Sequence, residues 1–207
     1  MLFDQPETLE PDDILDWHAL CTAGLRRERL DAHTCLESSA PLPSYLANAL
    51  VGATNTEIDR YFKSCQQELD LSAVLTLIAG AEARIRLDAQ RRTHPSANTL
   101  AGRLTFLQSQ AVRVWGVPLY KGGILDAWKN HVGTLTNLSP RERSRILTAI
   151  GGLKDVLRVR HWVAHGRYWQ LNRNIESYPP TTVAQTATSL YAALREVANY
   201  SGLMAFA

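Results

Sequence analysis

The stretch NLSPRERSRIL, residues 137–147, contains the clearest helix start in the chain. Ser139 suits the N-cap position, and Pro140 suits the first turn because its missing N–H would have no partner there. Glu142 stands three residues after the cap, which completes a capping box. The stretch therefore predicts a helix over about residues 140–165, which continues into RVRHWVAHGRYW at 158–169.

The predicted helix carries an apolar stripe that two cationic side chains interrupt. Its apolar positions recur at spacings of three, four or seven residues: Ile146, Ile150, Leu153, Leu157 and Ala164. Arg160 and His161 lie within about 60° of Leu157 on a helical projection, on the face that should be dry. A guanidinium keeps its charge and is costly to bury unpaired. We therefore expect either that a carboxylate meets Arg160 or that the stripe opens into a cleft there.

The rest of the chain also predicts helices. Helical periodicity and start signals occur at about residues 11–32, 54–92, 97–115, 122–132 and 181–200. The second of these segments is one long helix or two that meet near residues 70–72, and SSAPLPSY at 38–45 is expected to be a turn-rich linker. No segment alternates with period two for long enough to predict a sheet. We expect an all-α bundle of about five to seven helices, forming a single domain over residues 1–207.

Charge is distributed unevenly along the 207 residues, although the net charge is only +2. The first twenty residues hold six acids and no Lys or Arg, so the predicted helix at 11–32 is acidic. Residues 141–173 hold eight basic residues against Glu142 and Asp155. This asymmetry indicates an anionic partner near the C-terminal third, while a solvated basic face stays the alternative.

Three cysteines, Cys21, Cys35 and Cys65, are an odd number and are widely spaced. They predict neither a disulfide framework nor a zinc knuckle, and we expect buried free thiols in a reducing compartment. The first residues lack a basic segment followed by an apolar run, and no stretch reaches eighteen consecutive apolar residues. We therefore expect a cytoplasmic protein with no membrane partner.

The residues around Arg160 leave three interpretations open. In the first, Arg160 forms an internal ion pair with Glu82 or Asp88 of EARIRLD, and the histidines have ordinary helix-end roles. In the second, His161 and His165 stand four apart on one helical face, a spacing that can bind zinc. Against zinc, Trp162 stands where the HExxH pattern needs its glutamate, and no third ligand is evident, so we expect no metal and no cofactor.

The third interpretation is RNA cleavage without a metal. A histidine with a pKa near 6.5 can take a proton from a ribose 2′-hydroxyl at cellular pH. An arginine can hold a phosphate through two parallel hydrogen bonds and stabilise charge that gathers on its oxygens in the transition state. Together the two groups suffice for scission by the 2′-oxygen.

The motif RHWVAH at 160–165 resembles the R-x4-6-H signature of HEPN domains, helical proteins many of which are metal-independent endoribonucleases of toxin–antitoxin and phage-defence systems. The resemblance, which is greatest to the RiboL-PSP-type group, implies that Arg160 and His165 are the catalytic pair. The family often has a polar residue directly after its arginine, and His161 takes that position here. It also has an acid on an earlier long helix, and Glu82 corresponds to that acid. Arg158 also satisfies the spacing, so the phosphate clamp is Arg158 or Arg160.

The resemblance further implies a homodimer that pairs across the motif helix. Arg160 and His165 are about 140° apart on an ideal helix, which is too far for both side chains to contact one phosphate. Either the helix ends near Ala164, or two chains contribute residues to one cleft. RNA-binding candidates are Lys154, Trp162, Arg167 and Tyr168, and an antitoxin or inhibitor protein is a further possible partner. Some members of the family are modified on the tyrosine of an R-x4-H-x-Y motif. Tyr168 stands one residue beyond that position, so the motif does not predict this modification here. The alternative function is a catalytically inactive HEPN module that binds nucleotides or a protein.

Overall fold

The computed structural model describes residues 10–92, 99–111, 117–164 and 178–200. These residues form seven helices and no strand, which confirms the all-α prediction. The helices are α1 (Pro11–Ser38), α2 (Ser44–Leu50), α3 (Asn55–Arg91), α4 (Leu100–Ser109), α5 (Ile124–Thr134), α6 (Pro140–Ala164) and α7 (Pro180–Tyr200). No described helix combines the length and the apolar character that crossing a lipid bilayer requires.

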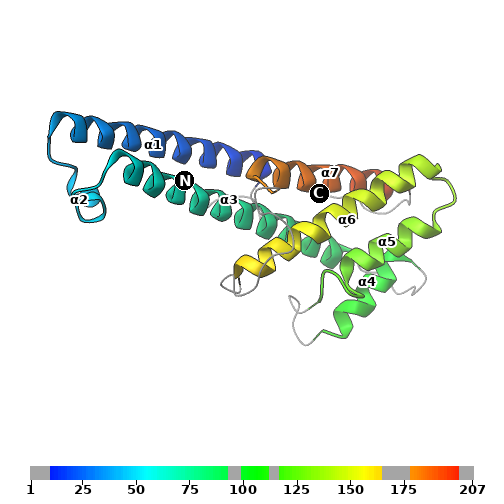
Figure 1. Ribbon diagram of the computed structural model, residues 1–207. Helices are drawn as coiled ribbons and strands as arrows, with labels where there is room; N and C mark the ends of the chain where they lie inside the picture. The colour runs from blue at the N-terminus through cyan, green and yellow to red at the C-terminus, as the bar shows by residue number, and fades with distance from the viewer. Residues whose placement is uncertain (1–9, 93–98, 112–116, 165–177, 201–207) are drawn as a thin grey trace.

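Helices α1 and α3 form a long antiparallel pair, and the other helices gather around one end of it (Figure 1). The short helix α2 closes the far end of the pair. At the near end α7 follows the line of α1 and packs on α3 and α6, while α4 and α5 complete the body. Helix α3 thus contacts α1, α4, α5, α6 and α7, and this crowding brings residues distant in sequence to one place.

Two apolar clusters hold these parts together. The larger lies in the body and includes the fully buried side chains Ile78, Ile85, Leu104, Leu125, Trp128, Ile146, Ile150, Leu153 and Leu190. The smaller lies at the far end of the α1–α3 pair and contains Ala32, Leu46, Leu50, Ile58 and Phe62. Burial of apolar side chains is the main stabilising contribution in both clusters.

Polar contacts fix the register of the long helices. Arg84 donates two hydrogen bonds to Glu10, from Nη1 to Oε1 at 2.8 Å and to Oε2 at 2.9 Å, and its guanidinium lies 4.7 Å from the ring centroid of Tyr191. Burial raises the pKa of the Tyr191 hydroxyl to about 12. Further along, His18 Nε2 lies 2.7 Å from Asp70 Oδ1. The start of α1, the middle of α3 and α7 are thereby joined.

The predicted capping box of the motif helix is confirmed. Ser139 N donates to Glu142 Oε2 at 2.9 Å, and Glu142 N donates to Ser139 Oγ at 3.3 Å. Thr54 and Glu57 form a second capping box at the start of α3. Because such caps satisfy the free N–H groups of the first turn with nearby residues, they can be recognised from a short stretch of sequence.

Other boundaries differ from the predictions. Helix α1 continues to Ser38, beyond the expected end near 32, and stops at Ser39 in the left-handed conformation (φ 55°). The expected linker at 38–45 contains the start of α2. Helix α3 is one helix and continues through residues 70–72, and α4 is shorter than expected, ending at Ser109.

The expectation of buried cysteines was wrong. Cys21, Cys35 and Cys65 are free thiols, but each is half-buried. Cys21 and Cys35 lie on α1 and Cys65 on α3, in the long pair, where fewer helices are available to cover a side chain than in the body.

Candidate functional site

The apolar stripe of α6 leaves the core at its C-terminal end. Ile146, Ile150, Leu153 and Leu157 are buried as predicted. The expectation that Arg160 and His161 lie on a dry face was wrong, because both are exposed and 45% of the Arg160 side chain is accessible. The reason is that the stripe reaches a pocket at the end of α6, and both expected outcomes occur there: a cleft opens, and the Glu82 carboxylate lies 3.2 Å from Arg160.

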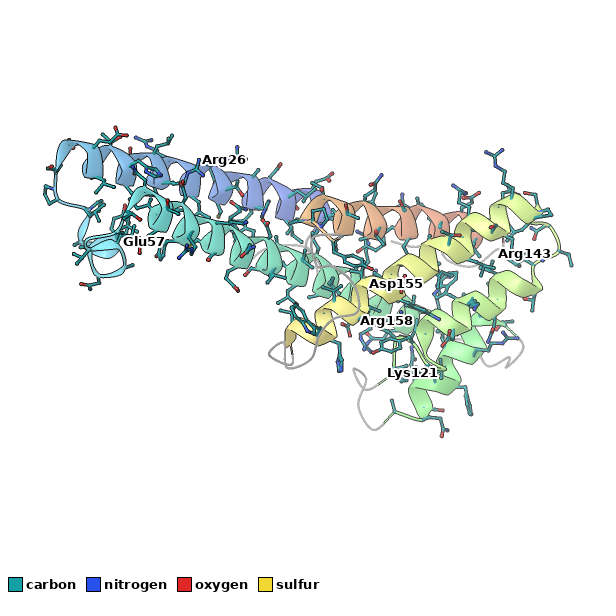
Figure 2. The ribbon with its side chains drawn as sticks, in the orientation of Figure 1. Arg26, Glu57, Lys121, Arg143, Asp155 and Arg158 are labelled. Carbon is teal, nitrogen blue, oxygen red and sulfur yellow. The ribbon has the colours of Figure 1, made fainter. Side chains whose placement is uncertain are left out.

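This pocket has a volume of about 350 Å³ and lies where three segments meet. Helix α3, the loop before α5 and the end of α6 supply its lining: Glu82, Arg86, Pro118, Leu119, Tyr120, Lys121, Leu157, Arg160 and His161. We call this set the α3–α6 pocket. Figure 2 labels Lys121 on the loop and Arg158 on the neighbouring part of α6. The volume falls in the range of small-ligand sites.

Glu82 holds the two arginines of the pocket. Its Oε1 accepts hydrogen bonds from Arg86 Nε at 3.1 Å and Nη2 at 2.8 Å, on the next turn of α3. Arg86 Nη1 donates to the carbonyl oxygen of Val117 at 2.5 Å. Arg160 Nη1 lies 3.2 Å from Glu82 Oε2, but this buried oxygen accepts no hydrogen bond from any residue that the structure describes.

These two contacts of Glu82 differ in strength. The Arg86 side chain is only 10% exposed and shares three aligned hydrogen bonds with Glu82 and Val117. The contact with Arg160 is an ion pair at charge-contact distance without hydrogen-bond alignment. An ion pair with a half-exposed guanidinium and no hydrogen-bond alignment is weak. Arg160 can therefore turn toward a ligand while Glu82 stays engaged with Arg86.

The charge of the α3–α6 pocket favours an anion. Arg86, Lys121 and Arg160 carry three positive charges against the single carboxylate of Glu82, with His161 also on the wall. Partial burial lowers the effective dielectric constant and strengthens the attraction for an anion relative to a flat surface.

Of the residues expected at the site, Arg160, His161 and Glu82 come together in the pocket, and three others do not. Arg158 is 66% exposed, pairs with Asp155 at 3.0 Å, and does not line the pocket. Lys154 Nζ contacts Asp126 Oδ1 on α5, and half-buried Trp162 is not among the lining residues. Of the two arginines that satisfy the motif spacing, Arg160 therefore lines the pocket and Arg158 does not.

Several expected residues lie outside the described part of the chain. His165, Arg167 and Tyr168 belong to the segment 165–177. Asp88, the other expected partner of Arg160, instead pairs with Arg92 at 2.8 Å. Burial raises the pKa of the Asp88 carboxyl. Within the described ranges, no three His, Cys, Asp or Glu side chains converge as ligands of a metal ion would.

Two lining cations were missed in the sequence. Arg86 stands one helical turn after Glu82, a spacing at which opposite charges meet, so its pairing had a local signal. Lys121 lies in GVPLYKGG, which predicted only a break between helices. Nothing local in that stretch indicates that its tip faces α6.

A comparison of the chain with protein-family models, with curated proteins and with solved structures finds no match. The functional inference therefore depends on the chemistry of the α3–α6 pocket and on the motif at 160–165.

Proposed function

We propose that the protein is a metal-independent endoribonuclease of the HEPN kind, with its active site at the α3–α6 pocket. The observation that carries the proposal is the position of Arg160, whose accessible guanidinium lies on the wall of a pocket with three cations and one carboxylate. The arginine of the RHWVAH motif is thus available to an anionic ligand. RNA phosphates are anions that arginine binds through two parallel hydrogen bonds.

In the proposed reaction His165 removes the proton from a ribose 2′-hydroxyl. The 2′-oxygen then attacks the neighbouring phosphorus, the bond from phosphorus to the 5′-oxygen breaks, and the 5′-oxygen gains a proton. His161, which lines the pocket, is the candidate donor of that proton. Arg160 stabilises the negative charge on the phosphoryl oxygens, and the products are a 2′,3′-cyclic phosphate and a 5′-hydroxyl.

Glu82 is a positioning residue in this scheme. Its carboxylate fixes Arg86 by two hydrogen bonds and lies 3.2 Å from Arg160, so it sets where both guanidinium groups sit before RNA binds. Preorganised charge lowers the cost of reorganisation during the reaction. Arg158, the alternative clamp, and Lys154 lie outside the pocket lining, and Trp162, Arg167 and Tyr168 are proposed contacts to RNA beyond it.

The proposal includes a homodimer across α6, with one α3–α6 pocket in each chain. Ser144, Thr148 and Gly151 are exposed along one side of this helix, and their small side chains would let a second α6 approach closely. A toxin or phage-defence effector of this kind would be held inactive by an antitoxin or inhibitor protein.

The test is cleavage of total RNA by the purified protein, with and without EDTA. We expect cleavage that EDTA does not stop, products with cyclic phosphate ends, and losses of about 10² to 10⁴-fold for His165→Ala and for Arg160→Ala. Lys129→Ala, which removes an exposed cation from α5 outside the pocket, is the matched control and should keep full activity. Loss of cleavage with EDTA, or products with 5′-phosphates, would contradict the mechanism.

RNA affinity supplies a second measurement. If the pocket and the basic segment 141–173 contact phosphates, the affinity for RNA should fall steeply as the salt concentration is raised. The reason is that protein binding releases the cations condensed on the RNA, and a high salt concentration opposes this release. An affinity unchanged by salt would indicate a protein partner instead.

A second function is favoured by one observation, the 3.2 Å ion pair between Arg160 and Glu82. In a catalytically inactive HEPN module this pair only ties α6 to α3, and the pocket binds a nucleotide or a protein. Such a protein would show no RNA cleavage at any concentration, and Arg160→Ala would lower its stability rather than an activity.

A further inference from the structure

The loop between α4 and α5 is fixed against the body along residues 117–123. Ile124 N donates to the Pro118 carbonyl oxygen at 2.9 Å, and Leu125 N donates to the Leu119 carbonyl oxygen at 2.8 Å. The chain passes so close to itself that a Cβ atom on Gly123 would lie 1.7 Å from the Pro118 oxygen. The loop therefore has one backbone path, and glycine is required at this crossing.

A second contact ties the tip of this loop to α6. Asp126 accepts a hydrogen bond from Gly122 N at 2.7 Å through Oδ2, while its Oδ1 contacts Lys154 Nζ. The Lys154 contact, followed by the Gly122 hydrogen bond, lowers the pKa of the Asp126 carboxyl. Lys154 thus positions the loop relative to the motif helix.

At the tip Lys121 adopts the left-handed conformation, with φ 57°, and Gly122 follows with φ 87°. A side chain other than glycine is disfavoured in this conformation, and such residues are often found at binding sites. Tyr120 packs against the body, whereas Lys121 is exposed at the rim of the α3–α6 pocket. Within the described residues, no ion pair involves Lys121.

Two cations therefore face the pocket from different elements with different chemistry. Arg160, from α6, presents a planar group that suits two oxygens of one phosphate. Lys121, from the loop, presents a compact point charge. Arg86 is already engaged by Glu82 and Val117, so it contributes charge but few free donors.

We infer that Lys121 binds the phosphate adjacent to the one held by Arg160, so that the pocket recognises two consecutive phosphates of one RNA strand. This inference rests on the proposed function for the identity of the ligand. It makes Lys121 a specificity-determining residue: an internal bond flanked by another phosphate should be preferred over the single bond of an unphosphorylated dinucleotide.

The test measures binding without cleavage. The probes are a 2′-O-methyl dinucleotide, which cannot be cut because its 2′-oxygen is blocked, and the same dinucleotide with a 5′- or a 3′-terminal phosphate. One terminal phosphate should tighten binding to the wild-type protein by about tenfold, as expected for one charge-assisted hydrogen bond. Lys121→Gln should abolish this gain, whereas Lys121→Arg, which keeps the positive charge, should retain it.

Lys129→Gln is the matched control, because it makes the same change of net charge on α5 away from the pocket and should keep the tenfold gain. Arg160→Ala should weaken binding of all three probes. Far-UV circular dichroism checks that Lys121→Gln keeps its helices. A gain that persists in Lys121→Gln, or that neither terminal phosphate produces in the wild type, would overturn the inference.

The two proposals fail in distinguishable ways. A gain that depends on Lys121 in a protein that cuts no RNA supports the inference and contradicts the nuclease activity. RNA cleavage together with a gain in affinity that does not depend on Lys121 supports the nuclease activity and contradicts the inference. Absence of binding to every probe contradicts the inference whatever the cleavage assay shows.

Discussion

Removing the Glu82 carboxylate should destabilise the protein much more than removing the guanidinium of Arg160 beside it. Glu82 is 14% exposed and accepts two hydrogen bonds from Arg86, which is 10% exposed. Glu82→Ala leaves that buried guanidinium with the Val117 carbonyl as its one hydrogen-bond acceptor among the described residues. Arg160→Ala leaves the Glu82–Arg86 hydrogen bonds intact, because they use the other carboxylate oxygen.

The expected magnitudes follow from this asymmetry. Loss of one partner of a buried ion pair costs about 3 kcal/mol or more of unfolding free energy. Loss of a half-exposed pair without hydrogen-bond alignment costs at most about 1 kcal/mol. For a domain of this size each kcal/mol corresponds to roughly 2–4 °C in Tm. Glu82→Ala should thus lower the Tm by about 6–12 °C and Arg160→Ala by less than about 4 °C.

Thermal unfolding followed by circular dichroism at neutral pH measures both values. Glu82→Gln, which keeps one acceptor oxygen and the volume of the side chain, should fall between the wild type and Glu82→Ala. The Glu82→Ala, Arg160→Ala double variant should be close to Glu82→Ala. If Arg160→Ala lowered the Tm as much as Glu82→Ala does, Arg160 would be a structural residue, and its proposed availability to phosphate would be refuted.

Three further predictions concern the loop, a histidine and the oligomeric state. Gly123→Ala should cost about 2 kcal/mol because its Cβ would overlap the Pro118 oxygen. Gly24→Ala, which has open space around it in the interior of α1, should instead raise stability by up to about 1 kcal/mol. Equal Tm changes in the two variants would contradict this reasoning. Burial, then Arg103 and Arg92, lowers the pKa of His131. The folded protein therefore binds a proton at His131 less readily than the unfolded chain does, and the stability that His131 contributes is lost as the pH falls below the ordinary histidine pKa near 6.5. His131→Gln should narrow the Tm difference between pH 7 and pH 5, and an unchanged difference would refute this prediction. Light scattering should show a dimer that Thr148→Arg converts to a monomer, and a wild-type monomer at micromolar concentration would exclude pairing across α6.

The helices could be predicted well where their signals are local. The capping box of Ser139 and Glu142 and the apolar spacing from Ile146 to Leu157 are features of adjacent turns, and both are present in the structure. Helix α2 was missed because the prolines around it indicate turns, yet Leu46 and Leu50 pack on Ile58 at the far end of α3. Burial against a distant segment outweighed the local preference there.

The candidate site could be predicted only in part. Glu82 was named as a partner of Arg160, and the two lie 3.2 Å apart. Arg160 was expected on a dry face because periodicity assigns a side chain to one side of its helix, but periodicity does not show where the neighbouring helices stop. Lys121 gave no signal, since a lysine between two helices is ordinary in any surface loop.

By itself the sequence determined the all-α class, the start of the motif helix and the concentration of basic residues between 141 and 173, because these depend on neighbours within a few turns. Tertiary structure alone decided that the stripe of α6 opens at Arg160, that Arg160 meets Glu82 rather than Asp88, and that Lys121 joins them. Those positions depend on how α3, α6 and the loop before α5 pack, and packing joins residues that no local pattern connects.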